Sequence, residues 1–524
     1  DSVTSLGRAA FSRNQLTSVT IPDSVTSISR EAFDDNQLTS VTIPDSVTSI
    51  EDYAFRYNQL TSVKIPASVT SIGALAFFGN LLATLTVPDS VTIIGARAFE
   101  ENLLTSLTLP DGLTSIERSS FRYNQLTSVT IPASVTSIGE LAFSRNQLAS
   151  ITIPDSVTII GARAFEENLL PSLTIPNGVI TIGEAAFGDN QLISVIIPDS
   201  VDDLGNFVFR NNFITDFKMP ITLYSSIGTF SGNKLSEVGI PSGVKIIGEA
   251  IFAWNLLENL ELPNSLEIIS YNAFSHNLLS SLDLPTTLKF LSGFNYNQIG
   301  SVELPAGIEI IGSRAFAGNP LLALNLPSTV TTLGPSFIAQ SSLSTIEIPA
   351  RVEKIYSEAF ASTDLQAVHF WGDRPHIELP GYQLTESTKM LAVTYCENRI
   401  GWPGESFGAF NAQGPSVFPS VVDCDSDDDG SNDDQDFYPF ISLGALEDTD
   451  GDGIPNACDS ACKSIGMLAD EDDDGDGVND SDDSFPLDDS ESADSDNDGV
   501  GDNSDDFPND ATESLDSDSD SVGD

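Results

Sequence analysis

The first two thirds of the chain repeat one order of apolar and polar positions, which residues 23–44 illustrate. Six apolar positions in this unit are separated by polar residues: Val25, Ile28, Phe33, Leu38, Val41 and Ile43. Val41 and Ile43 alternate with threonine, which predicts a short strand with both side chains inward, and Pro44 ends that strand. Residues 28–33 suit a tight helical or 3₁₀ turn that carries Phe33 inward, because a coil of 22 residues has no room for a longer helix.

Sixteen prolines mark the same place in successive units, from Pro22 to Pro349. Only the steps from Pro220 to Pro241 and from Pro285 to Pro305 depart from a spacing of 22 residues. A period of this length predicts a solenoid whose units bury their apolar faces against their neighbours. Asparagine also recurs once in each unit, at Asn14, Asn36, Asn58, Asn80, Asn102 and their equivalents. We expect it to turn inward and hydrogen-bond the loop backbone of the adjacent coil, because buried backbone groups need partners.

The units resemble the BspA-like leucine-rich repeats, in which an apolar strand ending in proline is followed by S-V-T-S-I-G, then A-F, then Cys or Asn. Residues 155–161, with Ala164, Phe165 and Asn168, match this pattern closely. The resemblance covers residues 1–371, about 17 units. It implies a curved, right-handed solenoid with a parallel β-sheet on one face and short strands, 3₁₀ turns and loops elsewhere. Trp371 replaces the proline of the last unit, and we expect residues 372–422 to form a C-terminal cap and linker.

The composition changes sharply after Val422. Residues 423–524 contain 37 acidic residues and a single basic one, Lys463, and so supply most of the formal net charge of −55. Such self-repulsion excludes a compact core without metal and argues against nucleic acid as a partner. An acidic disordered tail is the simplest alternative, but the regular spacing of the aspartates argues against it.

The acidic residues recur as D-x-D-x-D-G-x-x-[DN]-x-x-D, which matches a calcium loop with side-chain ligands at positions 1, 3, 5, 9 and 12 and a backbone carbonyl at position 7. The predicted ligands are Asp425, Asp427, Asp429, Ser431, Asp433 and Asp436; Asp448, Asp450, Asp452, Ile454, Asn456 and Asp459; Asp472, Asp474, Asp476, Val478, Asp480 and Asp483; and Asp494, Asp496, Asp498, Val500, Asp502 and Asp505. Four loops in register predict calcium as the cofactor. Residues 448–456 and the repeated Phe-Pro pairs at 485–486 and 507–508 resemble thrombospondin type 3 repeats. That resemblance implies a chain of calcium sites with little hydrophobic core over residues 423–524.

Cysteine usage favours an extracellular or cell-surface location. All four cysteines lie in the cap and the acidic tail, and they allow three pairings, of which proximity favours Cys396 with Cys424 and Cys458 with Cys462. No apolar run reaches the ~18 residues of a membrane span. Both ends cut through repeats, so we expect the chain to be a piece of something longer.

Two surfaces of the solenoid are candidates for binding a partner. The first is the outward face of the strands, where serine and threonine give way to charged residues from about Asp216 onward; high β-propensity on a solvated sheet is the simpler explanation of its threonines. The second is the position just before the recurring asparagine, where aromatic side chains stand at Tyr57, Tyr123, Trp254, His276 and Tyr296. These rings either mark a recognition edge or pack over the loops.

The sequence predicts no enzyme. Residues 404–408 match the G-x-S-x-G nucleophile pattern, but Trp402-Pro403 precede Ser406 instead of a buried strand, so a structural turn is favoured. The favoured function is an extracellular bacterial adhesion or recognition segment that binds a protein or glycan on a cell or matrix surface, with a calcium-stiffened stalk. The alternatives are a structural subunit of a surface layer or fibre, with self-association, and the targeting arm of a larger secreted enzyme.

Overall fold

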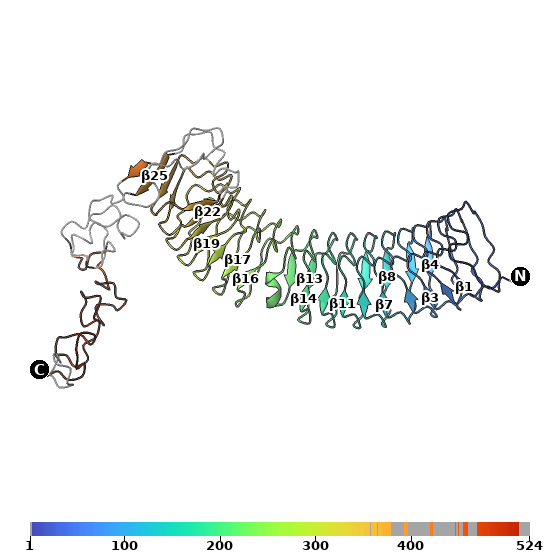
Figure 1. Cartoon of the computed structure of the whole chain (residues 1–524), viewed down its shortest axis with the longest axis horizontal. Helices are drawn as coiled ribbons and strands as arrows, with labels where there is room; N and C mark the ends of the chain where they lie inside the picture. Colours follow the sequence, from blue (N-terminus) through green and yellow to red (C-terminus); the bar gives the residue numbers. More distant parts are fainter. Residues whose placement is uncertain are drawn as a thin grey trace.

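The computed structural model describes residues 3–356, 358–363, 365–378, 392–396, 420–422, 446, 449, 454–458 and 469–512. Its main body is a gently curved parallel β-solenoid, which confirms the predicted repeat fold (Figure 1). Successive coils pair in a register of 22 residues, as in Ser27 with Ser49 and Thr84 with Ser106. The described residues contain one helix, the 3₁₀ helix η1 (Ile221–Ser225).

Each coil contributes to two columns of parallel strands. The first column consists of β1 (Ser27–Ile28), β2 (Ser49–Ile50), β3 (Ser71–Ile72), β5 (Ile93–Ile94), β7 (Ser115–Ile116), β9 (Ser137–Ile138), β11 (Ile159–Ile160), β12 (Thr181–Ile182), β14 (Asp203–Leu204), β16 (Ile246–Ile247), β17 (Ile268–Ile269), β18 (Phe290–Leu291), β19 (Ile310–Ile311), β20 (Thr332–Leu333), β22 (Lys354–Tyr356) and β24 (His376–Glu378). The second consists of β4 (Thr84–Thr86), β6 (Ser106–Thr108), β8 (Ser128–Thr130), β10 (Ser150–Thr152), β13 (Ser194–Ile196), β15 (Asp216–Lys218), β21 (Thr345–Ile348), β23 (Ala367–Phe370), β25 (Ala392–Cys396) and β26 (Ser420–Val422). We call the outward surface of this second column, with the equivalent segments of the other coils, the strand face.

The first column corrects a prediction. The stretch 28–33 was expected to form a helical or 3₁₀ turn, but it begins in strand β1 and continues as a turn without a helix. The backbone of Glu31 lies in the left-handed region, at a φ of 60°, which ends any right-handed helix there. Its N–H donates to the carbonyl of Asp52 in the next coil instead. The turn is therefore held by hydrogen bonds between coils.

The core is a column of stacked phenylalanine rings, one from nearly every coil. Phe143 is fully buried, and its ring centroid lies 5.5 Å from that of Phe121 and 5.6 Å from that of Phe165. Phe33 is likewise buried, as the sequence predicts. Isoleucine, valine and leucine from both strand columns surround the rings in one continuous apolar cluster.

The recurring asparagines form the predicted ladder between coils. Asn146 is buried, and its Oδ1 accepts a hydrogen bond from the N–H of Leu126 in the preceding coil at 3.0 Å. Its Nδ2 donates to the carbonyls of Phe121 at 2.9 Å and Phe143 at 3.1 Å. The Phe121 carbonyl also accepts from Asn124, so each such carbonyl is shared by the asparagines of two coils. The ladder thereby satisfies loop backbone that the sheets do not reach.

Two irregularities interrupt the repeat. Helix η1 replaces a first-column strand in the coil between Pro220 and Pro241, the first of the two short proline steps. The sheet of that column is broken between β14 and β16. Beyond Trp371, strands of the predicted cap continue both columns: β24 pairs with β22, and β25 pairs with β23. The register spacing in the second column stretches there from 22 residues to 25, for Ala367 with Ala392. The boundary predicted at residue 371 is thus crossed by continuous strand pairing.

Candidate functional site

Among the described residues, the strand face carries three hollows, one near the middle of the solenoid and two in its C-terminal half. They have volumes of about 400, 440 and 340 Å³ and lie around residues 173–199, 215–261 and 322–371, respectively. Each hollow adjoins a coil whose second-column segment forms no continuous strand: 173–175, 237–239, where Gly239 makes only an isolated bridge with Glu261, and 322–326. Paired strands are held about 4.8 Å apart by their hydrogen bonds, and unpaired segments lack this restraint. The three hollows therefore lie beside interruptions of the second strand column, whereas other interrupted segments, such as 63–65 and 281–283, line none of the three.

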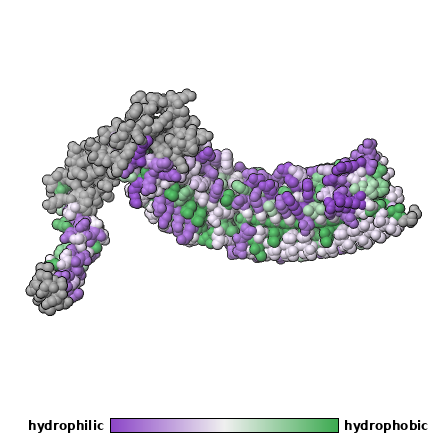
Figure 2. Space-filling model, in the orientation of Figure 1, coloured by the Kyte–Doolittle hydropathy of each residue, from purple (hydrophilic) through white to green (hydrophobic). Residues whose placement is uncertain are grey.

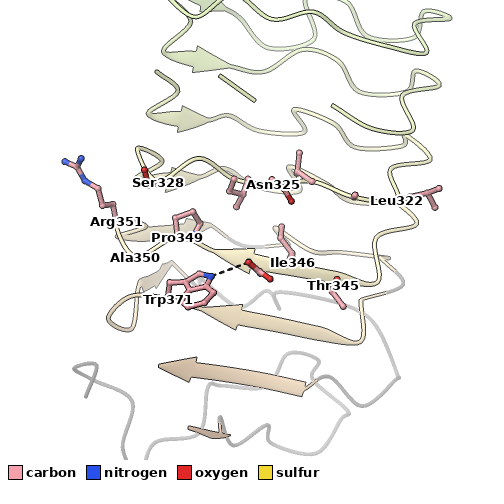
Figure 3. A pocket seen from close by; sticks show the side chains of 13 residues that line it. Leu322, Asn325, Ser328, Thr345, Ile346, Pro349, Ala350, Arg351 and Trp371 are labelled. Atoms are coloured by element: carbon pink, nitrogen blue, oxygen red, sulfur yellow. Dashed lines mark hydrogen bonds between the residues drawn. The ribbon is translucent and has the colours of Figure 1, made fainter. Parts of the chain in front are cut away.

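The hollow nearest the predicted cap has an aromatic wall (Figure 3). Its lining comes from the unpaired segment 322–326 with Ser328, from β21 and the Pro349–Arg351 turn, and from Trp371. Outward side chains at equivalent places, Asn325 and Glu347, stand one coil apart. Leu322 is 72% exposed at one end of the hollow, whereas the carbon floor includes the buried Leu324 and Ile346.

Trp371 is held in place from several directions. Its backbone N–H donates to the carbonyl of Ile348 at 3.0 Å, and its Nε1 donates to Oε2 of Glu347 at 3.4 Å. The ring of His369 meets the indole edge-on, with 4.5 Å between centroids. Gly372 follows directly, and a Cβ there would come within 2.2 Å of the carbonyl oxygen of Ala350. Only glycine permits this close approach, which sets the indole beside the Pro349–Arg351 turn.

The middle hollow coincides with the predicted change to charged residues. Asp216, Glu237 and Glu261 line it and are exposed. In the N-terminal half, Ser128 and Thr130 of β8 also face outward, as predicted. Figure 2 shows apolar residues scattered among polar ones over the solenoid, without one large apolar patch in that view. The character of the strand face thus changes along the chain while its backbone path is retained.

The predicted aromatic edge divides into three places. Trp254, His276 and Tyr296 form one stack over adjacent coils, with centroid distances of 3.6 Å and 4.5 Å. Trp254 is 60% exposed, while partial burial lowers the pKa of the His276 imidazole below its ordinary value.

The other two predicted residues pack singly. The ring of Tyr57 meets Phe78 edge-on and lies beside the guanidinium of Arg56. Tyr123 lies between the guanidinium groups of Arg122 and Arg145. The exposed stack around Trp254 is compatible with a recognition edge, whereas Tyr57 and Tyr123 pack against neighbouring side chains. A role of the five residues in binding stays a prediction.

Two of the predicted calcium loops, 472–483 and 494–505, lie among the described residues. In each, the aspartates at positions 1, 3 and 5 converge, with oxygens all within 4.8 Å of one another: Asp472, Asp474 and Asp476, and Asp494, Asp496 and Asp498. Several of these carboxylates have one oxygen fixed by a loop N–H and the other buried without a partner. Asp474 is 6% exposed; its Oδ1 accepts from the N–H of Asp476, and its Oδ2 has no partner.

This arrangement fits a cation bound by oxygen. Burial raises the pKa of the Asp496 carboxyl, and the negative charges of Asp498, Asp505 and Asp494 add to this effect. Hard cations such as Ca²⁺ take six to eight oxygen ligands, and a divalent charge relieves repulsion among clustered carboxylates. The residues present therefore meet the chemical requirements of a calcium site.

The side chains at position 9 accept hydrogen bonds within their own loops. Asp502 accepts hydrogen bonds from the backbone N–H of Ser495 at 2.7 Å and from its hydroxyl at 2.6 Å. Asp480 and Asn456 likewise accept from the N–H of position 2 in their own loops. These hydrogen bonds brace the loops; Asp480 and Asp502 are not among the converging aspartates, and a role of position 9 as a calcium ligand stays a prediction.

The other predicted ligands are only partly described. The side chains at position 12, Asp483 and Asp505, each accept an N–H two residues on, from Phe485 and Phe507. All ligands of the loop 425–436 lie outside the described residues, as do Asp448, Asp450, Asp452 and Asp459. Ser406, of the nucleophile pattern, also lies outside the described residues. Among the cysteines, Cys458 is disulfide-bonded.

Sequence reasoning missed the hollow beside Trp371. The replacement of proline by tryptophan in the last unit was noted only as the end of the repeat. A bulky planar side chain at a place that is otherwise proline was the available signal. Nothing in the sequence singles out Asn325 and Glu347 as residues that line a hollow, because exposed polar residues are frequent at their places in the repeat.

Comparison with known proteins identifies the repeat. A family model described as the BspA type leucine rich repeat region matches residues 1–103, 92–215, 222–293 and 291–399. Among solved structures, YopM from Yersinia enterocolitica WA-314 is 21% identical, with 73% of this chain and 85% of that chain covered and a TM-score of 0.43. A leucine-rich repeat protein from Bacteroides ovatus ATCC 8483 is 23% identical, with 68% and 82% covered and a TM-score of 0.39. A leucine rich cell surface protein from Faecalibacterium prausnitzii A2-165 is 24% identical, with 55% and 88% covered and a TM-score of 0.35.

No curated protein matches the chain significantly. In the described part of the chain, no helix has the length and hydropathy that crossing a membrane requires. Since the family model spans most of the solenoid, the chain belongs to the BspA type leucine-rich repeat family.

Proposed function

We propose that this chain is a non-enzymatic recognition segment of a bacterial surface or secreted protein, and that its strand face binds a protein or glycan on a cell or matrix surface. The observation that carries the proposal is the row of three hollows along the strand face, where the outward side chains also change from hydroxyl to charged residues. Inward side chains and the asparagine ladder hold the coils together. Outward side chains of the strand face are therefore free to vary without loss of the fold.

Binding of the labelled chain to cells and to immobilised matrix polymers tests this proposal. A triple variant of the middle hollow, Asp216→Ala, Glu237→Ala and Glu261→Ala, is expected to bind much more weakly. A matched control removes three exposed acids from the other strand column, Asp202→Ala, Glu309→Ala and Glu353→Ala, and is expected to bind like the parent. Equal loss in both variants would indicate a general effect of charge and would contradict binding by the strand face.

We also propose that the acidic tail binds calcium and serves as a stiffened stalk. The converging aspartates with buried, unpartnered oxygens support this proposal. Without a cation, mutual repulsion among these carboxylates opposes closure of the loops, so binding and folding are coupled. Chelator is then expected to make residues 469–512 protease-sensitive while the solenoid melts as before, with protection restored at about 0.1–1 mM calcium.

A pair of variants sharpens the calcium test. Asp498→Ala removes a converging carboxylate and is expected to raise the calcium concentration needed for protection. Asp489→Ala removes an exposed carboxylate outside the loops and is expected to leave it unchanged. Equal proteolysis in chelator and in calcium would refute the metal assignment. Growth of ordered polymers on adding calcium would instead favour the structural subunit of a surface layer or fibre.

A further inference from the structure

The hollow beside Trp371 differs from the other two in being lined by a tryptophan, whose indole forms one wall (Figure 3). The indole is fixed by its own backbone, by Glu347 and by His369, so it is preorganised before any ligand arrives. A rigid tryptophan offers large contact area without loss of side-chain freedom on binding. This wall is therefore suited to stacking against a flat or ring-shaped apolar surface.

Next to this wall lie polar groups that can form hydrogen bonds with the hydroxyl groups of a ligand. Glu347 presents a carboxylate that accepts hydrogen bonds, Asn325 presents an amide that both donates and accepts, and Thr345 presents a hydroxyl. All three side chains are exposed on the strand face. A few convergent polar groups against a largely carbon surface are typical of small-ligand sites.

Size and charge narrow the choice of ligand. The volume of about 340 Å³ is near the lower end for ligand pockets, so the hollow suits one small ring rather than an extended segment. The side chain of Arg351 extends away from the indole in Figure 3, whereas the Glu347 carboxylate accepts a hydrogen bond from it. That carboxylate and the net charge of −55 disfavour an anionic ligand.

We propose that the hollow formed by Trp371, Glu347 and Asn325 binds one ring of a neutral saccharide, with the ring's C–H face against the indole and its hydroxyls on the carboxylate and amide. The inference rests on the proposed recognition function and names the ligand class of one part of the strand face. A basic peptide side chain is the competing occupant, because a cation can also lie over an indole beside a carboxylate.

The test uses the full chain with ¹⁵N-labelled tryptophan, in which the Trp371 indole N–H is assigned by Trp371→Phe. The probes are maltotriose, cellotriose, mannotriose and chitotriose, with trigalacturonate and Nα-acetyl-lysinamide as charged alternatives. At least one neutral trisaccharide is expected to shift the Trp371 resonance and to leave that of the distant Trp254 unchanged. No shift with any neutral trisaccharide overturns the inference, as does stronger binding of either charged probe.

Matched variants locate the contact. Trp371→Ala is expected to weaken binding about tenfold. Glu347→Gln, which keeps the shape but removes the charge, is expected to weaken it about threefold. Glu303→Gln changes an exposed acid at the equivalent place two coils away and is expected to bind like the parent. Unchanged binding in both Trp371→Ala and Glu347→Gln overturns the inference, and Glu347→Gln keeps the test valid if the tryptophan variant unfolds the last coils.

The cell-binding assay separates this inference from the proposed function. If Trp371→Ala still binds cells while the middle-hollow triple variant does not, only the saccharide site is wrong. If neither variant changes binding to cells, recognition by the strand face is itself wrong.

Discussion

The asparagine ladder permits a prediction whose magnitude follows from the atoms that each amide satisfies. Asn146→Ala leaves the N–H of Leu126 without an acceptor, since Oδ1 of Asn146 is its hydrogen-bond partner. The carbonyl of Phe121 keeps the amide of Asn124, and that of Phe143 keeps the amide of Asn168. One buried donor is therefore orphaned, at a cost of about 1–3 kcal/mol, and two further hydrogen bonds of about 0.5–1 kcal/mol each are lost. The total is about 2–5 kcal/mol.

Hydrogen exchange measures this loss where it occurs. Unfolding of a repeat protein is not a single two-state event, so an overall midpoint would dilute a local effect. The amide of Leu126 is expected to exchange about 30-fold to 4,000-fold faster, while amides several coils away, such as that of Leu279, keep their protection. Gln147→Ala alters the exposed neighbour of Asn146 and serves as the control with no expected change.

A second substitution distinguishes the hydrogen bond that the Asn146 side chain accepts from the hydrogen bonds that it donates. Asn146→Asp keeps an oxygen for Leu126 but turns a second oxygen toward two carbonyls, so it is expected to be at least as destabilising as alanine. If both variants left the protection of Leu126 unchanged, or lowered protection uniformly along the solenoid, the ladder would not have the role assigned to it.

Three further predictions concern the core, the turns and the tail. Phe143→Ala is expected to cost about 3–5 kcal/mol, measured as local loss of exchange protection, because its fully buried ring stacks on both sides. Ala250→Gly is expected to stabilise the chain by up to about 1 kcal/mol in thermal unfolding, because Ala250 has a φ of 51°, in the left-handed region that glycine tolerates. The control Ala273→Gly changes a buried alanine outside that region and should destabilise the chain in the same experiment. Asp496→Asn is expected to weaken calcium binding, measured by calorimetry, about tenfold. Asp502→Asn retains an acceptor for the N–H of Ser495 and should change the calcium affinity much less. A larger effect of Asp502→Asn would indicate that position 9 is a calcium ligand.

The sequence was informative about features that depend only on the side chains within one repeat unit. Alternation of apolar and polar residues placed Phe33 and Ile43 inside, and both are buried. The recurring asparagine was expected to bind loop backbone of the next coil, and Asn146 does so. These features depend on side-chain chemistry that repeats every 22 residues, so a single unit predicts them.

The sequence was less informative where hydrogen bonds between coils decide the backbone. The stretch 28–33 has a helix-like order of apolar residues, yet Glu31 adopts a left-handed conformation because its N–H reaches Asp52 in the next coil. In the loop 494–505, the carboxylate of Asp502 likewise accepts hydrogen bonds from the backbone and the hydroxyl of Ser495, which the calcium motif does not predict. Neither outcome follows from the residue types alone, since each requires a partner set by the local path of the folded chain.

By itself the sequence determined the coil length, the buried phenylalanine column, the asparagine ladder and the spacing of the acidic loops, because each arises from a short repeated pattern of side-chain size and polarity. Only the tertiary structure decided where the strand face opens into hollows and that Trp371, Glu347 and Asn325 share one of them. The same holds for the stack of Trp254, His276 and Tyr296. Such features depend on how closely neighbouring coils approach, and that distance is set by strand pairing and by contacts such as Gly372 against Ala350, which no single repeat contains.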